Sequence, residues 1–284
     1  MARVTMERWR IGSVEITKVP ELVLPLPLQG LLPDATAADV DRHRWLRPHF
    51  VNEEGLALLS FHALVVATGE QTILVDTCIG NDRTTLPELP PMHTPFLDDL
   101  AAVGYPRERI DTVVCTHLHF DHVGWHTMLV DGRWTVTFTQ ARHLVARDEW
   151  EHWRSTETEL TNLGDTLRPV LDAGLVDLVL PVHQICDEVR LEPTPGHTPG
   201  HVSVRIRSEG EEAVITGDVV HHPVQFAEPE LRSASDSDAD VARSTRRAFA
   251  ERYGDDSTLV IGTHFVAPTA GNLVREGHGW RFEC

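Results

Sequence analysis

Short runs of apolar, β-branched residues recur along the chain and predict a series of strands. Residues 58–67 and 72–76 form two such runs, and the turn between them contains Gly69, so together they predict a β-hairpin. Residues 11–19 alternate apolar and polar side chains and predict a strand with one exposed face, whereas the continuous run 111–115 predicts a buried strand. Further strands are predicted at residues 135–138, 176–180, 188–192, 201–207, 212–216 and 257–261.

Segments with helical spacing of apolar residues alternate with these strands. Residues 96–103 are predicted to form a helix that ends at Gly104, because glycine commonly follows the last residue of a helix. Residues 140–154 and 157–173 are also predicted to be helical, and residues 236–252 are predicted to be a polar stretch followed by a helix. Strands and helices that alternate in this way predict an α/β protein.

Residues 20–56 break the pattern, because they combine several prolines with little periodicity. Proline lacks the N–H group that a strand or helix interior needs, so the apolar stretch 23–28 is not expected to be a central strand or a helix. Long irregular segments are often functional, and this one could cover a site, contact the second subunit of a homodimer, or drape over the surface. No linker or internal repeat divides the chain, so we predict a single domain over residues 1–284.

Charge narrows the possible partners. The chain has 284 residues, 41% of them hydrophobic, and a formal net charge of -18 from 25 basic and 43 acidic side chains. Such a surface repels nucleic acid and anionic membranes, so neither is expected as a partner. The polar N-terminus does not resemble a signal peptide and no apolar run is long enough to cross a bilayer, so a cytoplasmic location is expected.

The four cysteines are widely scattered and form no Cys-x-x-Cys pair, so neither a zinc knuckle nor a redox motif is indicated. Cys78 and Cys115 lie in apolar strand contexts. We expect both to be inert core residues.

Three histidines and an aspartate fall within residues 117–122, directly after the predicted buried strand. Neutral imidazole nitrogen and carboxylate oxygen are the usual ligands of Zn²⁺ and similar ions, and ligands gather beyond the carboxyl ends of strands in open sheets. His117 and His119 would face the same way in extended chain, whereas Asp121 and His122 are adjacent and diverge. One pair can therefore serve one metal ion and the other pair a second.

The pattern His-x-His-x-Asp-His after an apolar strand resembles the metallo-β-lactamase superfamily of hydrolases. In that family a distant histidine, a bridging aspartate and a final histidine complete the ligand set, and this chain offers His197, Asp218 and His264 in matching contexts. The resemblance covers roughly residues 11–273 and implies an αββα sandwich of two mixed β-sheets flanked by helices. It also implies that Asp76 orients a metal-binding histidine.

The resemblance further implies two divalent metal ions bridged by a carboxylate and by a hydroxide that attacks the substrate. Three histidines would hold the first ion, an aspartate and two histidines the second, and one aspartate would bridge them. In that order the ligands are His117, His119 and His197; Asp121, His122 and His264; and Asp218. The di-iron branch of the family has a glutamate in place of His119, so Zn²⁺ is expected, with Mn²⁺, Co²⁺ or Fe²⁺ as alternatives.

Residues 262–271, Gly-Thr-His-Phe-Val-Ala-Pro-Thr-Ala-Gly, resemble the last metal loop of the branch that contains acyl-homoserine lactonases and methyl parathion hydrolase. Lactonases often place a tyrosine three residues after the bridging aspartate, where it contacts the substrate carbonyl, and here that position is His221. His221 could donate a hydrogen bond to the oxyanion or the leaving oxygen, or it could be a satisfied polar residue near the site. Asp121 and His221 are the candidate catalytic residues.

The function that we predict is hydrolysis of an ester-like bond in a small molecule, a lactone or a carboxylic ester, with a phosphotriester as an alternative substrate. A cysteine-containing class of the family destroys antibiotics, but it has that cysteine at the place of Asp218, which weighs against β-lactams. A second hypothesis is a thioesterase similar to glyoxalase II, although no cluster of Lys or Arg near the C-terminus would bind glutathione or coenzyme A. A third is a metal-binding sensor without catalysis, which the complete set of seven ligands disfavours.

Overall fold

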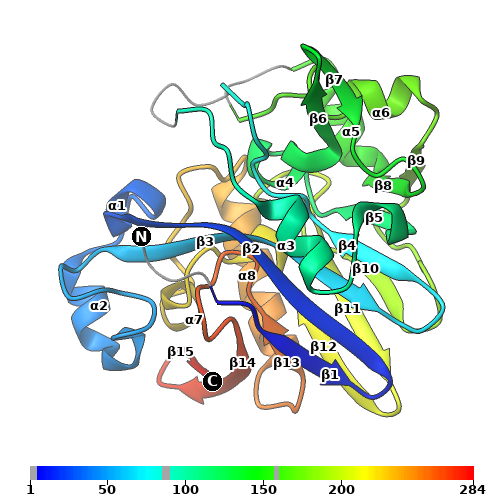
Figure 1. Cartoon of the computed structure of the whole chain (residues 1–284). Coiled ribbons are helices and arrows are strands. Elements are labelled where there is room, and N and C mark those ends of the chain that lie inside the picture. The colour runs from blue at the N-terminus through cyan, green and yellow to red at the C-terminus, as the bar shows by residue number, and fades with distance from the viewer. Residues whose placement is uncertain (1–4, 85–89, 157–159) are drawn as a thin grey trace.

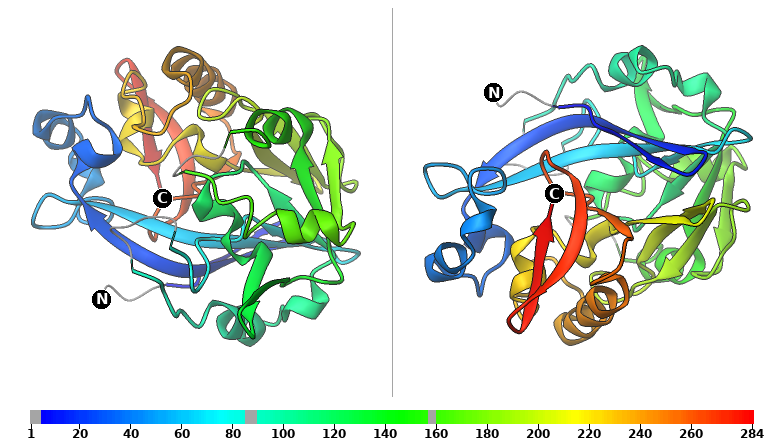
Figure 2. Two further views of the ribbon diagram at one scale, coloured as in Figure 1. Left: turned by 90° about the horizontal axis from the view of Figure 1, so that it is seen from above. Right: turned by 90° about the horizontal axis from the view of Figure 1, so that it is seen from below.

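The computed structural model describes residues 5–84, 90–156 and 160–284. Two β-sheets lie face to face, and helices cover their outer faces (Figures 1 and 2). The larger sheet runs in the order β1 (Arg8–Ile11), β2 (Val14–Leu26), β3 (Ala57–Ala67), β4 (Thr72–Val75), β5 (Thr112–Cys115), β8 (Arg142–Ala146) and β9 (Val176–Val179). The smaller sheet consists of β10 (Val189–Pro193), β11 (Val202–Ser208), β12 (Glu211–Ile215), β13 (Leu259–Ile261), β14 (Ala270–Glu276) and β15 (Gly279–Glu283).

Both sheets are mixed. In the larger sheet β1 to β4 are antiparallel neighbours, whereas β4, β5, β8 and β9 are parallel. In the smaller sheet only β12 and β13 pair in parallel. A separate hairpin is formed by β6 (Thr127–Val130) and β7 (Arg133–Val136). The α-helices are α1 (Leu28–Leu31), α2 (Ala37–Arg42), α3 (Phe96–Ala102), α4 (Phe120–Val123), α5 (Arg147–Trp153), α6 (Arg168–Asp172), α7 (Val224–Ala227) and α8 (Ala239–Tyr253). Single 3₁₀ turns are η1 (Arg44–Leu46), η2 (Arg107–Arg109), η3 (Gly124–His126) and η4 (Gly217–Val219).

Alternation along the strands builds the layers, because successive side chains of a strand point to opposite faces. In β3, Leu64 packs between the sheets with residues such as Val204 and Ile215 of the smaller sheet. Its neighbour Val65 instead packs outward, in the cluster that contains Phe96 of α3. The predicted αββα sandwich is therefore confirmed.

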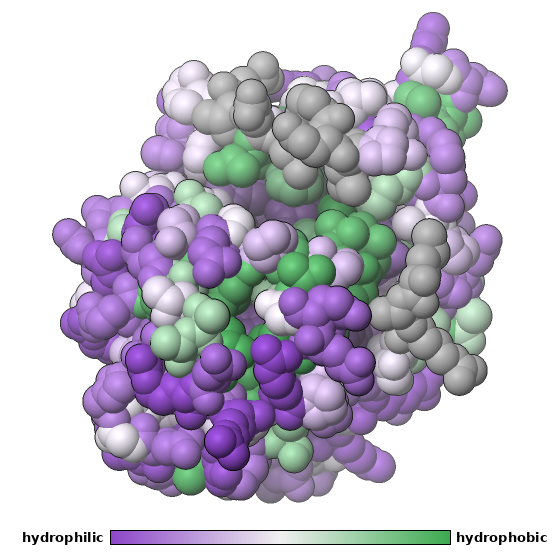
Figure 3. All heavy atoms as spheres, turned by 90° about the vertical axis from the view of Figure 1, so that its left-hand side faces the viewer, coloured by the Kyte–Doolittle hydropathy of each residue, from purple (hydrophilic) through white to green (hydrophobic). Residues whose placement is uncertain are grey.

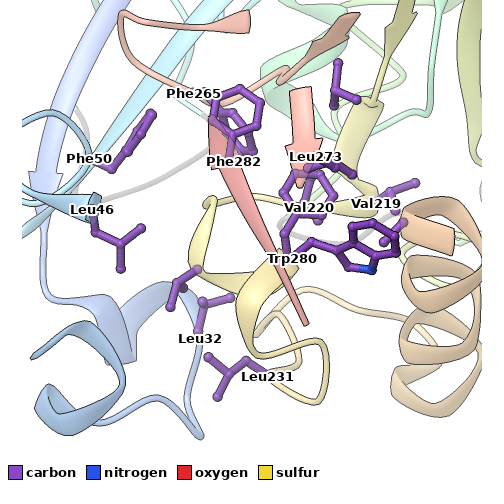
Figure 4. Packing of buried hydrophobic residues seen from close by; sticks show 14 of the residues in the cluster. Leu32, Leu46, Phe50, Val219, Val220, Leu231, Phe265, Leu273, Trp280 and Phe282 are labelled. Carbon is purple, nitrogen blue, oxygen red and sulfur yellow. The ribbon is translucent and has the colours of Figure 1, made fainter. Parts of the chain in front are cut away.

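A third apolar cluster lies on the outer side of the smaller sheet, where α8 and the N-terminal helices meet it. Phe50, from the segment after η1, makes edge-on ring contacts with Phe265 and Phe282 at centroid distances of 6.1 and 5.9 Å. Trp280 of β15 and Leu46 belong to the same cluster (Figure 4). The segment between β2 and β3 is thus anchored by its own apolar side chains.

The expectation that residues 20–56 are irregular is wrong for residues 20–26, which continue β2. Strand β2 pairs with β3 as far as Leu26, with a shift of register between Pro20 and Leu22. Strand β1 pairs only with residues 14–17 of β2, so the later part of β2 is an edge, where proline is tolerated.

We predicted one helix over residues 140–154, and this prediction is wrong. The segment consists of strand β8 followed by helix α5. Leu144 and Val145 are buried between β5 and β9, and burial in a sheet outweighs a helical spacing of apolar residues. The predicted helix at 157–173 is reduced to α6, and residues 157–159 lie outside the described part of the chain.

The predicted exposed face of the stretch 11–19 is only partly present: the side chain of Glu15 is 46% exposed, but the face does not continue beyond it. Gly12 and Ser13 form the turn between β1 and β2, and the side chains of Thr17 and Lys18 are buried. Cys78 and Cys115 are buried as expected, and burial raises the pKa of both thiols well above the ordinary value. Among the described residues, no helix has the length and apolar character needed to cross a bilayer.

Candidate metal centre

The predicted ligands come together where loops leave the carboxyl ends of strands in both sheets. The larger sheet supplies the residues that follow β5, including those in α4. The smaller sheet supplies His197 between β10 and β11, Asp218 in η4 after β12, and His264 after β13. Residues that are up to 147 positions apart in the sequence therefore converge at one edge of the sandwich, as expected for strands whose ends meet there.

Three histidines form the first group. His119 Nδ1 lies 3.1 Å from His117 Nε2 and 3.0 Å from His197 Nε2. All three side chains are buried, and burial lowers their pKa values well below the ordinary value. They are therefore neutral near pH 7, which is the form that binds metal ions.

The second group consists of one carboxylate and two imidazoles. Asp121 Oδ2 lies 3.6 Å from His122 Nε2 and 3.6 Å from His264 Nε2. The side chain of Asp121 is 12% exposed, whereas both histidines are buried. This group therefore lies nearer to the opening of the site than the first.

Asp218 lies between the two groups. Its Oδ2 atom is 3.4 Å from His197 Nε2 and 3.2 Å from His264 Nε2, and its Oδ1 atom is 3.4 Å from His122 Nε2. The backbone around it is held tightly, because Asp218 N donates to His201 Nε2 at 2.7 Å. Gly217 has a φ of 54°, and a Cβ there would lie 2.5 Å from His201 Nε2, so glycine is required.

In most of the ligand histidines, Nδ1 faces away from the site and contacts a hydrogen-bond acceptor. The acceptors hold the proton on Nδ1, so the Nε2 lone pair points into the site. The pairs are His122 with Asp76 Oδ2 at 2.9 Å, His197 with Asp236 Oδ1 at 3.1 Å, His264 with the Ser60 carbonyl at 3.1 Å, and His117 with Thr116 Oγ1 at 3.1 Å. The role expected for Asp76, orienting a histidine, agrees with its contact to His122.

This arrangement fits a divalent cation. Two Nε2 lone pairs face His119 Nδ1, which can donate a proton to only one of them. His122 Nε2 and Asp218 Oδ1 are buried without a hydrogen-bond partner. No Lys or Arg of the described residues forms an ion pair with Asp121 or Asp218. Converging lone pairs and two carboxylates without a cationic partner are what metal ions satisfy.

His122 illustrates the same need for positive charge. Burial alone would lower the pKa of its imidazole, but the carboxylates of Asp218 and Asp121 outweigh burial and raise this pKa well above the ordinary value. A divalent cation would supply that positive charge in place of the proton.

His221, the candidate catalytic histidine, borders both Asp218 and the cavity beside it. Its Nε2 atom lies 3.2 Å from Asp218 Oδ2, and its ring stacks on that of His264 at a centroid distance of 5.7 Å. Its Nδ1 atom is buried without a hydrogen-bond partner. Gln225 Oε1 accepts the backbone N–H of His221 at 2.7 Å and so fixes the turn that carries it.

A cavity of about 300 Å³ opens beside the two groups. Ligand side chains, His221 and the segment 233–235 line part of it. The apolar side chains of the lining, which make up its apolar wall, are Leu31, Leu59, Phe61, Phe120 and Leu160. No Lys or Arg occurs among its described lining residues. On the face that carries α1 and α2, hydrophobic residues gather in a hollow with hydrophilic residues around it (Figure 3).

The sequence alone did not reveal two contacts behind the ligands. Asp236 lies 39 positions after His197, in the loop before α8, and no motif marks it. Ser60 contributes only its backbone carbonyl, which any residue could supply, so its side chain carries no signal. His201 and Thr116, by contrast, lie close to ligands in the sequence, so a supporting role for them can be predicted from the sequence.

Comparison with known proteins supports a metal-dependent hydrolase. The sequence profile described as the metallo-beta-lactamase superfamily matches residues 61–264. The chain belongs to the metallo-beta-lactamase superfamily.

Two groups of curated relatives support this assignment. A protein of Mycobacterium tuberculosis described as a probable metallo-hydrolase is 27% identical over 222 residues, which cover 70% of this chain and 68% of that protein. An N-acyl homoserine lactonase of a Bacillus species is 26% identical over 172 residues, which cover 61% of this chain and 62% of that protein.

Solved structures share the fold. The dizinc quorum-quenching lactonase AidC, in complex with a product, has a TM-score of 0.80 at 19% identity, over 98% of this chain and 96% of that one. The hydrolase AbOPH has a TM-score of 0.82 at 23% identity, over 100% of this chain and 98% of that one. The fold therefore extends beyond residues 61–264 to nearly the whole chain.

Proposed function

We propose that this protein is a dinuclear metal hydrolase that cleaves the ester-like bond of a lactone or a carboxylic ester. The observation that carries the proposal is the pair of ligand groups that share Asp218, with an apolar cavity beside them. The seven proposed ligands are those that the sequence predicts, with Zn²⁺ as the expected metal. Two bound divalent ions would supply Lewis acidity and a hydroxide at neutral pH.

The side chains of the protein have three roles in this proposal. The acceptors behind the histidines keep the Nε2 atoms aimed at the site, so that little reorganisation is needed when the ions bind. The apolar wall, with Phe61 and Phe120, holds the hydrocarbon part of the substrate and excludes water. His221 donates a hydrogen bond to the substrate oxygen that develops negative charge, and Asp121 is placed at the open side of the second group.

The lack of Lys and Arg among the described lining residues of the cavity favours a neutral substrate over the thioester alternative. Glutathione carries carboxylates and coenzyme A carries phosphates, and cationic side chains are the usual partners of such groups. The described lining contains none. A phosphotriester is also uncharged, so it stays the second candidate substrate.

A panel of substrates tests the proposal directly. Zinc-loaded protein would be assayed with lactones of different alkyl length, aryl esters, thioesters and phosphotriesters. We expect the highest kcat/KM for a lactone or ester with an apolar chain. A clear preference for thioesters would support the glyoxalase-like alternative, and no turnover of any compound would favour a metal-binding sensor.

Metal content gives a separate prediction. Protein purified without chelator should contain close to two equivalents of divalent metal per chain, because two ligand groups are present. Removal of the metal with a chelator should abolish hydrolysis, and Zn²⁺ should restore it. Elemental analysis beside activity measures both, and full activity in metal-free protein would contradict the proposal.

The proposed role of His221 predicts a loss of rate without a loss of metal. His221→Ala should keep both ions and lower kcat by about 10²–10³-fold, the usual cost of losing one donor to a developing oxyanion. His221→Tyr should partly restore turnover, because a phenol can donate the same hydrogen bond. Metal content and steady-state kinetics of both variants test this role. Loss of metal in His221→Ala would show that His221 is a metal ligand. An unchanged kcat would show that it takes no part in the reaction.

A further inference from the structure

Glu149 is a buried carboxylate of α5 for which the proposed reaction has no direct use. Its side chain is almost fully buried, and the donors that contact it from the described residues are neutral. Its Oε1 atom accepts the backbone N–H of Leu118 at 3.0 Å and the indole N–H of Trp153 at 2.7 Å. Its Oε2 atom accepts the backbone N–H of Gly200 at 2.9 Å.

The two backbone amides belong to the two loops that carry the three-histidine group. Leu118 lies between His117 and His119, in the loop that leaves β5 of the larger sheet. Gly200 lies three residues after His197, in the loop between β10 and β11 of the smaller sheet. One carboxylate therefore joins the two halves of this group, with one oxygen for each loop.

The close approach of α5 to the second loop is itself specific. A Cβ on Gly200 would lie 2.1 Å from the backbone nitrogen of Glu149 and 2.5 Å from its Cα. Only glycine permits this contact, since the nearest neighbours of that Cβ are main-chain atoms that cannot rotate away. Val202 N also donates a hydrogen bond to the Thr116 carbonyl at 3.0 Å, which links the ends of the same two loops.

A buried carboxylate without a cationic partner is costly to maintain. None of the ion pairs in the described part of the chain involves Glu149. The hydrogen bonds that its oxygens accept offset part of this free-energy cost, and two of them fix the relative position of the two loops. A neutral amide in its place would have one acceptor oxygen, and its NH₂ group would face one of the two N–H donors.

We propose that Glu149 is a positioning residue for the three-histidine metal site. It fixes the separation of the two loops, so that His119 Nδ1 lies 3.0–3.1 Å from the Nε2 atoms of His117 and His197 before any ion arrives. This inference rests on the proposed ligand set, because it assigns Glu149 a role only if these histidines bind metal.

The test compares Glu149→Gln with Glu21→Gln in metal-free full-length protein. Glu21 is also a buried carboxylate, and it also accepts two backbone N–H groups, of Ile79 and Gly80, and one indole N–H, of Trp125. The loop that it holds carries none of the three histidines. Glu21→Gln therefore removes the same kinds of bond at a place where the inference predicts no effect on this metal site.

Zn²⁺ affinity would be measured by competition with a chromophoric chelator, and the absorption spectrum of Co²⁺-loaded protein would report on the ligand geometry. We expect Glu149→Gln to bind Zn²⁺ about 10–100-fold more weakly, as is usual when a group behind the ligands is lost. We also expect it to change the Co²⁺ spectrum. Glu21→Gln should match the wild type at the three-histidine site in both measurements, because among the described residues the loop that it holds contacts a ligand only in the second group, through Asp76 and His122.

Wild-type affinity and spectrum in Glu149→Gln, or an equal loss in Glu21→Gln, would overturn the inference. A wild-type protein that binds no metal would instead refute the proposed function, so the two failures are distinguishable. If Glu149→Gln does not fold, amide hydrogen exchange in the metal-free wild-type protein tests whether the two loops are fixed. Leu118 and Gly200 should then be protected as strongly as Val204 of β11, and rapid exchange at both would overturn the inference.

Discussion

Replacement of Asp218 by alanine should abolish hydrolysis while the protein stays folded. The oxygens of Asp218 lie within 3.4 Å of histidines from both ligand groups, so its loss removes the link between the two proposed ions. Metal ions contribute several kcal/mol to a hydrolytic transition state. About 4 kcal/mol corresponds to a factor of roughly a thousand in rate. We therefore expect kcat/KM to fall at least about a thousandfold.

His117→Ala should have a similar effect, because it removes a ligand of the first group. The matched control is His278→Ala, since His278 is exposed in the turn between β14 and β15 and contacts only Glu228 among its described ion-pair partners. His126 is unsuitable as a control, because it is buried with its Nδ1 atom 2.7 Å from His143 Nδ1. Kinetics, metal content and thermal unfolding would be measured together. Equal losses of activity in all three variants would mean that the site lies elsewhere.

Arg246→Ala should be the most destabilising single change outside the metal ligands. Arg246 of α8 is fully buried, and burial lowers its pKa only to about 10, so it stays charged near pH 7. It donates at 2.9 Å to the carbonyls of Val219, Pro229 and Leu231. Its Nη2 atom lies 3.8 Å from Asp236 Oδ2. The guanidinium thus holds the segment after Asp218 and the carboxylate behind His197.

Loss of this side chain leaves the buried carboxylate of Asp236 without its cation and removes donors from three carbonyls. Breaking a buried pair in this way costs about 3–5 kcal/mol. For a protein of this size that lowers Tm by about 5–8 °C. Thermal unfolding of metal-free protein measures the effect.

Arg247→Ala is the natural control, because Arg247 is the next residue of the same helix but its side chain is 53% exposed in an ion pair with Glu230. Its loss should change stability by less than about 0.5 kcal/mol. A drop in Tm that is equal in the two variants would show that Arg246 acts through helix propensity and not through its buried contacts.

The sequence predicted those parts of the site that depend on short-range patterns. His117, His119 and His122 lie within six residues after a buried strand, and that spacing is visible without a fold. The contacts of Asp236 and Glu149 depend instead on how α8 and α5 pack against distant loops. No local pattern encodes such packing, so neither residue could be found from the sequence.

The same distinction explains the errors in the fold. Strands whose apolar character is local, such as β3 and β4, were predicted correctly. Strand β2 contains Pro20 and Pro25, and its position at the edge of a sheet, with a register shift beside Pro20, makes them acceptable. The spacing of apolar residues in strand β8 is compatible with a helix. Its position between β5 and β9, which the sequence does not show, makes it a strand.

The origin of the ligands in two different sheets gives the proposed metal ions a second effect, as cross-links. Under the proposed ligand set, the first ion ties residues after β5 to a residue between β10 and β11, which is the kind of long-range tether that a disulfide provides elsewhere. Neither sheet could separate from the other without releasing that ion. Resistance to heat would then rise with the concentration of free metal, because an ion that binds only the folded chain shifts the folding equilibrium toward it.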